Sequence, residues 1–82
     1  MKIRVNISLK KAVLDTQGKA IESALVKNLG YNQISNVRQG KFVDLEIKAD
    51  TVEEATKIVD EIADKLLVNK IIEDYNFEIL KN

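Results

Sequence analysis

The sequence holds 82 residues, 45% hydrophobic and 32% charged, which predicts one small soluble domain over residues 1–82 with a thin core. It contains no His and no Cys, which excludes histidine bases, thiolate nucleophiles and disulfides, and it has no apolar run near the roughly 20 residues of a membrane span. A net charge of zero disfavours sequence-independent nucleic-acid binding, which depends on uncompensated phosphate contacts. The simplest expectation is a cytoplasmic protein.

The charges are unevenly divided along the chain. Residues 1–41 carry eight Lys or Arg against two acidic residues, whereas residues 42–82 carry five Lys against eleven Asp or Glu. One interpretation is chance placement on a solvated surface. The other is a pair of oppositely charged faces, which favours docking to a second copy or to a partner.

The first half of the chain begins with a strand. Residues 2–10 alternate polar and apolar side chains, which is typical of a half-buried strand. Asp15 offers an N-cap to a helix whose apolar residues recur on one face, and Gly30 ends that helix. Residues 34–38 predict a short strand and Gln39-Gly40 a turn.

The second half repeats the order strand, helix, strand. Residues 43–49 alternate as a strand, and Thr51 to Glu54 form a capping box before a strongly amphipathic helix. Asn69 is expected to close this helix in the left-handed conformation, and residues 71–80 predict the last strand.

This order predicts an α+β, ferredoxin-like β-α-β-β-α-β fold, with two helices on one face of an antiparallel sheet. In an alternative arrangement the second and third strands are one long bent strand, with a bulge at Gln39-Gly40. The outward side chains of the first strand are polar, and a second copy or a partner is expected to cover that open face.

Catalytic chemistry finds little support in the sequence. The three serines have no histidine base, the acidic residues of the second helix lie on its solvated face, and no glycine-rich phosphate loop is present. A small-molecule regulatory module of the ACT type is a real alternative, because Gly18 at a helix start would let a ligand approach backbone amides.

Five short segments resemble those of the PurS family, the small subunits of phosphoribosylformylglycinamidine synthase, over nearly the whole chain. In order they are residues Val13–Ala20, Leu29–Tyr31, Val37–Lys41, Lys65–Asn69 and Ile72–Tyr75. The chain departs from the family pattern at Thr16 and Lys70, where the family usually has proline.

The resemblance implies an accessory, non-catalytic role in purine biosynthesis. A PurS-like subunit would form a homodimer or a dimer of dimers and would bridge a glutaminase subunit (PurQ) and a synthetase subunit (small PurL), supporting ammonia transfer. It would bind no cofactor itself, since ATP and Mg²⁺ would belong to the synthetase subunit, and neither nucleic acid nor membrane is expected as a partner. We expect its partner-interface residues to be Asp15, Gln17, Gly18, Lys19, Arg38, Gly40, Lys41, Asn69, Glu73, Asp74 and Tyr75.

Overall fold

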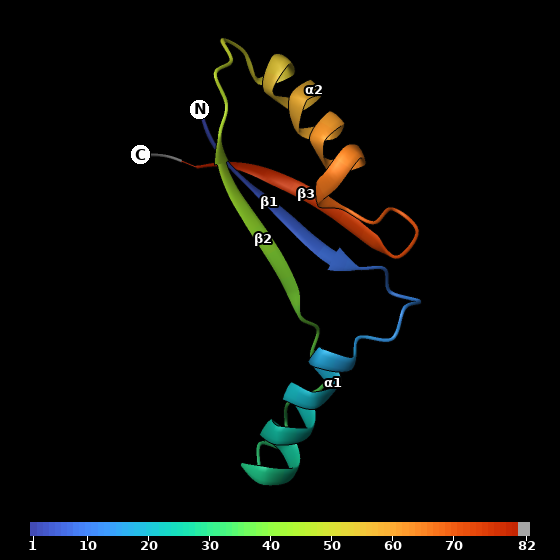
Figure 1. The fold of residues 1–82 in the computed structure, drawn as a ribbon. Helices are drawn as coiled ribbons and strands as arrows, with labels where there is room; N and C mark the ends of the chain where they lie inside the picture. Colours follow the sequence, from blue (N-terminus) through green and yellow to red (C-terminus); the bar gives the residue numbers. More distant parts are fainter. Residues whose placement is uncertain (81–82) are drawn as a thin grey trace.

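A computed structural model describes residues 1–80 and places the first strand at the centre of the sheet. β1 (Lys2–Leu9) pairs antiparallel with β2 (Gly40–Glu46) on one side and with β3 (Glu73–Leu80) on the other (Figure 1). Val5 lies opposite Val43 in β2 and opposite Phe77 in β3. The α+β class and the antiparallel sheet are therefore confirmed.

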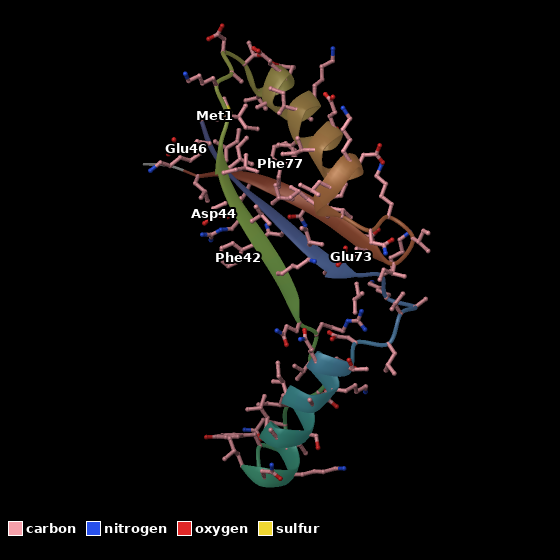
Figure 2. The ribbon with its side chains drawn as sticks, viewed as in Figure 1. Met1, Phe42, Asp44, Glu46, Glu73 and Phe77 are labelled. Atoms are coloured by element: carbon pink, nitrogen blue, oxygen red, sulfur yellow. The ribbon has the colours of Figure 1, made fainter. Side chains whose placement is uncertain are left out.

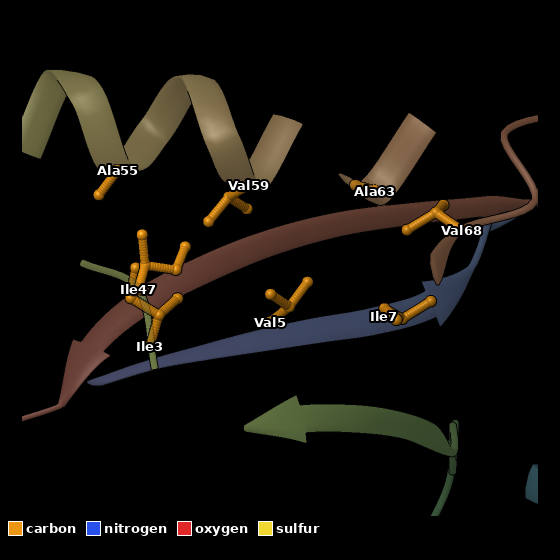
Figure 3. Packing of buried hydrophobic residues seen from close by; sticks show 8 residues of the cluster. All are labelled: Ile3, Val5, Ile7, Ile47, Ala55, Val59, Ala63 and Val68. Atoms are coloured by element: carbon orange, nitrogen blue, oxygen red, sulfur yellow. The ribbon is translucent and has the colours of Figure 1, made fainter. Parts of the chain in front are cut away.

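One face of this sheet carries the hydrophobic core (Figure 3). Side chains alternate between the two faces of a strand, so Ile3, Val5 and Ile7 point the same way, and all three are buried. Burying each of them contributes about 1.5–3 kcal/mol. The buried hydrophobic cluster consists of Ile3, Val5, Ile7, Ile47, Ala55, Val59, Ala63 and Val68.

The helix that covers this face is α2 (Val52–Ile62), continued by a π-helical turn, Ala63–Leu67. It buries Ala55, Val59 and Ala63 completely against the sheet. Alanine at two of these three positions lets the helix backbone approach the strands closely. Within residues 1–80, neither helix is long and apolar enough to cross a membrane.

Both ends of α2 carry side-chain hydrogen bonds. The Thr51 hydroxyl accepts from the Glu54 amide at 3.1 Å, as predicted, while the Glu54 carboxylate accepts from the Asp50 amide at 3.2 Å. The predicted left-handed Asn69 is wrong, because the only non-glycine residue with positive φ in the described chain is Asn36. The helix instead ends at an extended Val68, and the Asn69 side chain accepts from the Ile71 amide at 3.2 Å to form the turn.

The other helix, α1 (Thr16–Ser23), projects away from the sheet together with a π-helical turn, Ala24–Asn28 (Figure 1). The radius of gyration is 16.1 Å, whereas a compact domain of this length has about 12 Å. The expectation that both helices cover one face of the chain's own sheet is therefore wrong. We call residues 16–36 the arm; Gly18 is its single buried residue.

The strand predicted at residues 34–38 is also absent, and within residues 1–80 the sheet has three strands. Asn36 is left-handed, with φ of 55°, and the amides of Val37 and Gln39 donate to the carboxylates of Glu22 and Asp15. Those donors are therefore not available for a sheet ladder. Gln39-Gly40 is not a hairpin turn, since Gly40 begins β2 directly.

Candidate partner interface

The predicted interface residues gather at one end of the sheet, in two groups. The first comes from the base of the arm and the start of β2. The second consists of Asn69 and the first residues of β3. Ser8 of β1 pairs with Gly40 on one side and with Asp74 on the other, and the Lys41 ammonium lies 3.5 Å from the Glu73 carboxylate. Figure 2 shows Glu73 at this end, near the tip of β1. The structure thus brings together segments that are about 30 residues apart in the sequence.

Asp15 is the centre of the first group and is 4% exposed, the one buried charged residue of the described chain. One carboxylate oxygen accepts from the Gly18 amide at 2.9 Å, which caps α1 as predicted. The other accepts from the Gln39 amide at 2.7 Å. The bonds from Gln39 and Gly18 hold the pKa of the Asp15 carboxyl below its usual value, and the Arg38 charge adds to this effect.

Gly18 has no room for a side chain. A Cβ atom built there would lie 2.6 Å from the Asp15 carboxylate and 2.6 Å from the Val37 carbonyl oxygen. Its amide is already used by Asp15, so it is not free for a ligand. This arrangement counts against the ACT-type alternative, which needed an exposed amide at this place.

Arg38, two residues after the arm, reaches back to the end of β1 and the loop that follows it. Its guanidinium donates to the carbonyl oxygens of Leu9 at 3.2 Å, Lys10 at 3.1 Å and Val13 at 3.4 Å. Its Nε atom lies 4.0 Å from the Asp15 carboxylate. Since the arginine side chain is still 44% exposed, its outer edge remains open to a partner.

The remaining residues of the first group are more exposed. Gln17 and Lys41 line a hollow of about 240 Å³ between the arm and the end of β1, together with Ser8, Asp15, Gln39 and Glu73. Lys19 lies exposed on α1, and Gly40 packs against the Ile7 carbonyl oxygen.

The second group is organised by Glu73. Its carboxylate accepts from the Asn69 amide at 2.8 Å, and the Glu73 amide in turn donates to the Asn69 carbonyl oxygen at 2.7 Å. Asp74 is exposed on the opposite face of the strand, because adjacent strand residues point to opposite faces. Tyr75 points to α2, where its hydroxyl donates to the Asp60 carboxylate at 2.8 Å. Lys70, where the family usually has proline, pairs with Asp64 at 3.0 Å.

The open face of the sheet is polar, as its sequence predicted. Arg4 donates to both oxygens of Asp44 at 2.8 and 3.0 Å and lies 4.3 Å from the centre of the Phe42 ring. Figure 2 shows Phe42 and Asp44 on β2, away from the core. Asn6 donates to Asn76 at 3.1 Å, so this face is tied together across all three strands.

Sequence reasoning missed two participants at the base of the arm. Glu22 accepts from the Val37 amide, and Gln39 contributes through its backbone. No sequence signal distinguishes Glu22 from a solvated helix residue, and a backbone donor has no signature at all.

The described residues form a small α+β domain with a three-stranded antiparallel sheet, and several residues predicted for the interface hold the chain's own segments together. Among residues 1–80, no group of three or more His, Cys, Asp or Glu could hold a metal ion. A family model described as "PurS: Phosphoribosylformylglycinamidine (FGAM) synthase" matches residues 2–81. The chain belongs to the PurS family.

Individual relatives agree with this assignment. The chain is 43% identical over 79 residues to phosphoribosylformylglycinamidine synthase subunit PurS of Bacillus subtilis, covering 95% of this chain and 90% of the relative. It is 46% identical over 71 residues to the Mycobacterium leprae subunit, covering 87% of this chain and 85% of that one.

Solved structures give the same result. The crystal structure of Methanocaldococcus jannaschii PurS superposes with a TM-score of 0.85 at 37% identity, covering 99% of this chain and 96% of that one. A chain from the structure of PurLQS from Thermotoga maritima superposes with a TM-score of 0.88 at 32% identity. The match covers 96% of this chain and 95% of that one.

Proposed function

We propose that this chain is the small, non-catalytic PurS subunit of phosphoribosylformylglycinamidine synthase in purine biosynthesis. The observation that carries the proposal is the family match over residues 2–81, together with a PurLQS neighbour of the same fold. The complex would use ATP and glutamine to convert formylglycinamide ribonucleotide to the amidine, in the cytoplasm. ATP and Mg²⁺ are assigned to the synthetase subunit, PurL, and no cofactor to this chain.

We further propose that the chain bridges PurL and the glutaminase subunit, PurQ, and so supports ammonia transfer between them. The exposed outer edge of Arg38, Lys41 and the exposed Asp74 offer charged groups at one end of the sheet. A bridging subunit needs surfaces rather than reacting groups, and the polar end of the sheet is such a surface.

The arm supports pairing with a second copy of this chain. Its side chains Ile21, Leu29 and Tyr31 are 41%, 64% and 48% exposed, which is unusual for one contiguous apolar helix face and the turn after it. A helix of this length is marginal on its own in water. It therefore needs a surface to pack on that the rest of its own chain does not provide.

The core side of β2 offers a surface on which such a helix can pack. α2 lies toward β3, to which Tyr75 and Asp60 tie it, and β2 is the strand farthest from it in Figure 3. Val43 and Leu45, on the core side of β2, are only half-buried. Each copy thus carries an exposed apolar helix face and a strand that is only partly covered, and two copies can cover these surfaces symmetrically. We propose a homodimer, or a dimer of dimers, on this basis.

Co-purification with PurL and PurQ tests the function. The chain is mixed with both subunits, with and without Mg-ADP and glutamine, and each pool is assayed with glutamine and with ammonia as the nitrogen source. We expect a complex in which glutamine-dependent amidine formation requires this chain, while ammonia-dependent formation by PurL does not. Failure to bind either subunit would refute the proposal.

A further inference from the structure

The arm touches the rest of the molecule mainly through charged side chains that bind backbone groups. Asp15 joins the first turn of α1 to residue 39, and Arg38, two residues after the arm, joins the segment that follows it to the carbonyl oxygens of residues 9, 10 and 13. Glu22 joins the middle of the arm to residue 37. We call Asp15, Gly18 and Arg38 the clasp.

The clasp constrains the direction of the arm. Its acceptors and donors belong to three separate pieces of chain: the end of β1 with the following loop, the start of α1, and the segment entering β2. Backbone groups at the ends of strands and helices are fixed by their own ladders, so a side chain that bonds several of them fixes the angle between the elements. Gly18 lets these pieces approach within a distance that any side chain would prevent.

No comparable restraint comes from apolar packing. The core cluster contains residues of β1, α2 and the segments that flank α2, and none from the arm. Without the clasp, the apolar face of α1 would be free to swing, and the half-buried Val43 and Leu45 of the same chain would attract it.

We infer that the clasp holds the arm extended, so that α1 is presented to a second copy instead of folding onto its own sheet. This inference rests on the proposed homodimer. Asp15 and Arg38 are then positioning residues: they need not touch the second copy, yet they determine whether the two copies can exchange their arms.

The test combines amide hydrogen exchange with the dimer dissociation constant, measured on the full chain. Asp15→Asn keeps the size of the side chain but turns an NH₂ group toward one of the two amides. Loss of a hydrogen bond to a buried charged group predicts about tenfold faster exchange at the Gly18 and Gln39 amides, with exchange in β1 unchanged, and about a tenfold weaker dimer. The matched control is Glu61→Gln, which removes an exposed carboxylate bonded to Lys65 at 2.6 Å.

Arg38→Gln provides a second variant that leaves the buried carboxylate in place, with Lys65→Gln as its control. We expect it to weaken the dimer several-fold. Unchanged exchange at Gly18 and Gln39 in Asp15→Asn would overturn the clasp. Faster exchange with an unaltered dissociation constant in both variants would overturn its control of pairing. A wild-type chain that stays monomeric at all concentrations would overturn the homodimer and with it this inference. The proposed function is tested separately, by binding to PurL and PurQ.

Discussion

The hydroxyl of Tyr75 in β3 donates to the carboxylate of Asp60 in α2, across 2.8 Å. This bond ties the covering helix to an edge strand of the sheet. Tyr75→Phe removes the bond and keeps the ring, so we expect it to lower the free energy of unfolding by about 1 kcal/mol, as measured by urea denaturation. A double-mutant cycle with Asp60→Asn should show the two effects to be non-additive. Additive effects would mean that the bond contributes nothing.

Replacing Gly18 with alanine has two opposing effects on stability. Alanine at this helical position would gain about 1 kcal/mol of helix propensity. It would also put a Cβ atom 2.6 Å from both the Asp15 carboxylate and the Val37 carbonyl oxygen, so part of the backbone must shift. Overpacking of this kind costs about 1–3 kcal/mol, and we expect Gly18→Ala to lower the melting temperature. Ala20→Gly, at an exposed position of the same helix, controls for propensity alone.

Acid should weaken the clasp. The pKa of Asp15 is lower in the folded chain than in the unfolded one because the Gln39 and Gly18 amides and the nearby Arg38 favour the carboxylate. Its stabilising effect is therefore fully present above the ordinary carboxyl pKa of about 4 and is lost as pH falls through the lowered value. The free energies of unfolding of wild type and Asp15→Asn are measured from pH 7 to about 2.5. Their difference should stay constant down to the ordinary carboxyl pKa and shrink at lower pH. A difference independent of pH would contradict the assignment.

Thr51 begins α2 through its hydroxyl, which accepts from the Glu54 amide. Thr51→Ala leaves that amide without its cap and should cost about 1 kcal/mol in a chemical denaturation curve. Thr51→Ser retains the acceptor and should restore most of the loss. Equal destabilisation by Ala and Ser would point to the methyl group instead of the cap.

Val59 and Val52 form a matched pair on one helix. Val59 is fully buried, whereas Val52 is 51% exposed. Truncating Val59 to Ala removes two buried methyl groups and leaves a cavity, at a cost of about 2 kcal/mol. Val52→Ala should change the unfolding free energy by about 0.5 kcal/mol or less. Similar losses in both variants would mean that α2 is not packed as described.

The sequence predicted the elements whose hydrophobic pattern reflects packing within this same chain. The alternation in residues 2–10 and the apolar spacing in α2 both reflect the core between them, and the structure confirms both elements. The Asp15 and Thr51 caps were also predictable, because each bonds an amide three residues away.

The errors share a different physical cause. The apolar face of α1 was assigned to the chain's own sheet, since a sequence pattern shows that a face is buried but not by which molecule. Residues 34–38 look like a strand, yet carboxylates 15 and 24 residues away take the Val37 and Gln39 amides. The expected roles of Lys19, Lys41 and Asp74 in partner binding remain predictions.

The order β2-β1-β3 also bears on how the protein is made. β1 leaves the ribosome first but occupies the middle of the sheet, and its partners β2 and β3 begin at residues 40 and 73. β1 can therefore pair along one edge only after β2 has been made, and its other edge stays open until β3 follows. Pairings between segments this far apart in sequence slow folding, so formation of the sheet is expected to limit the folding rate of this chain.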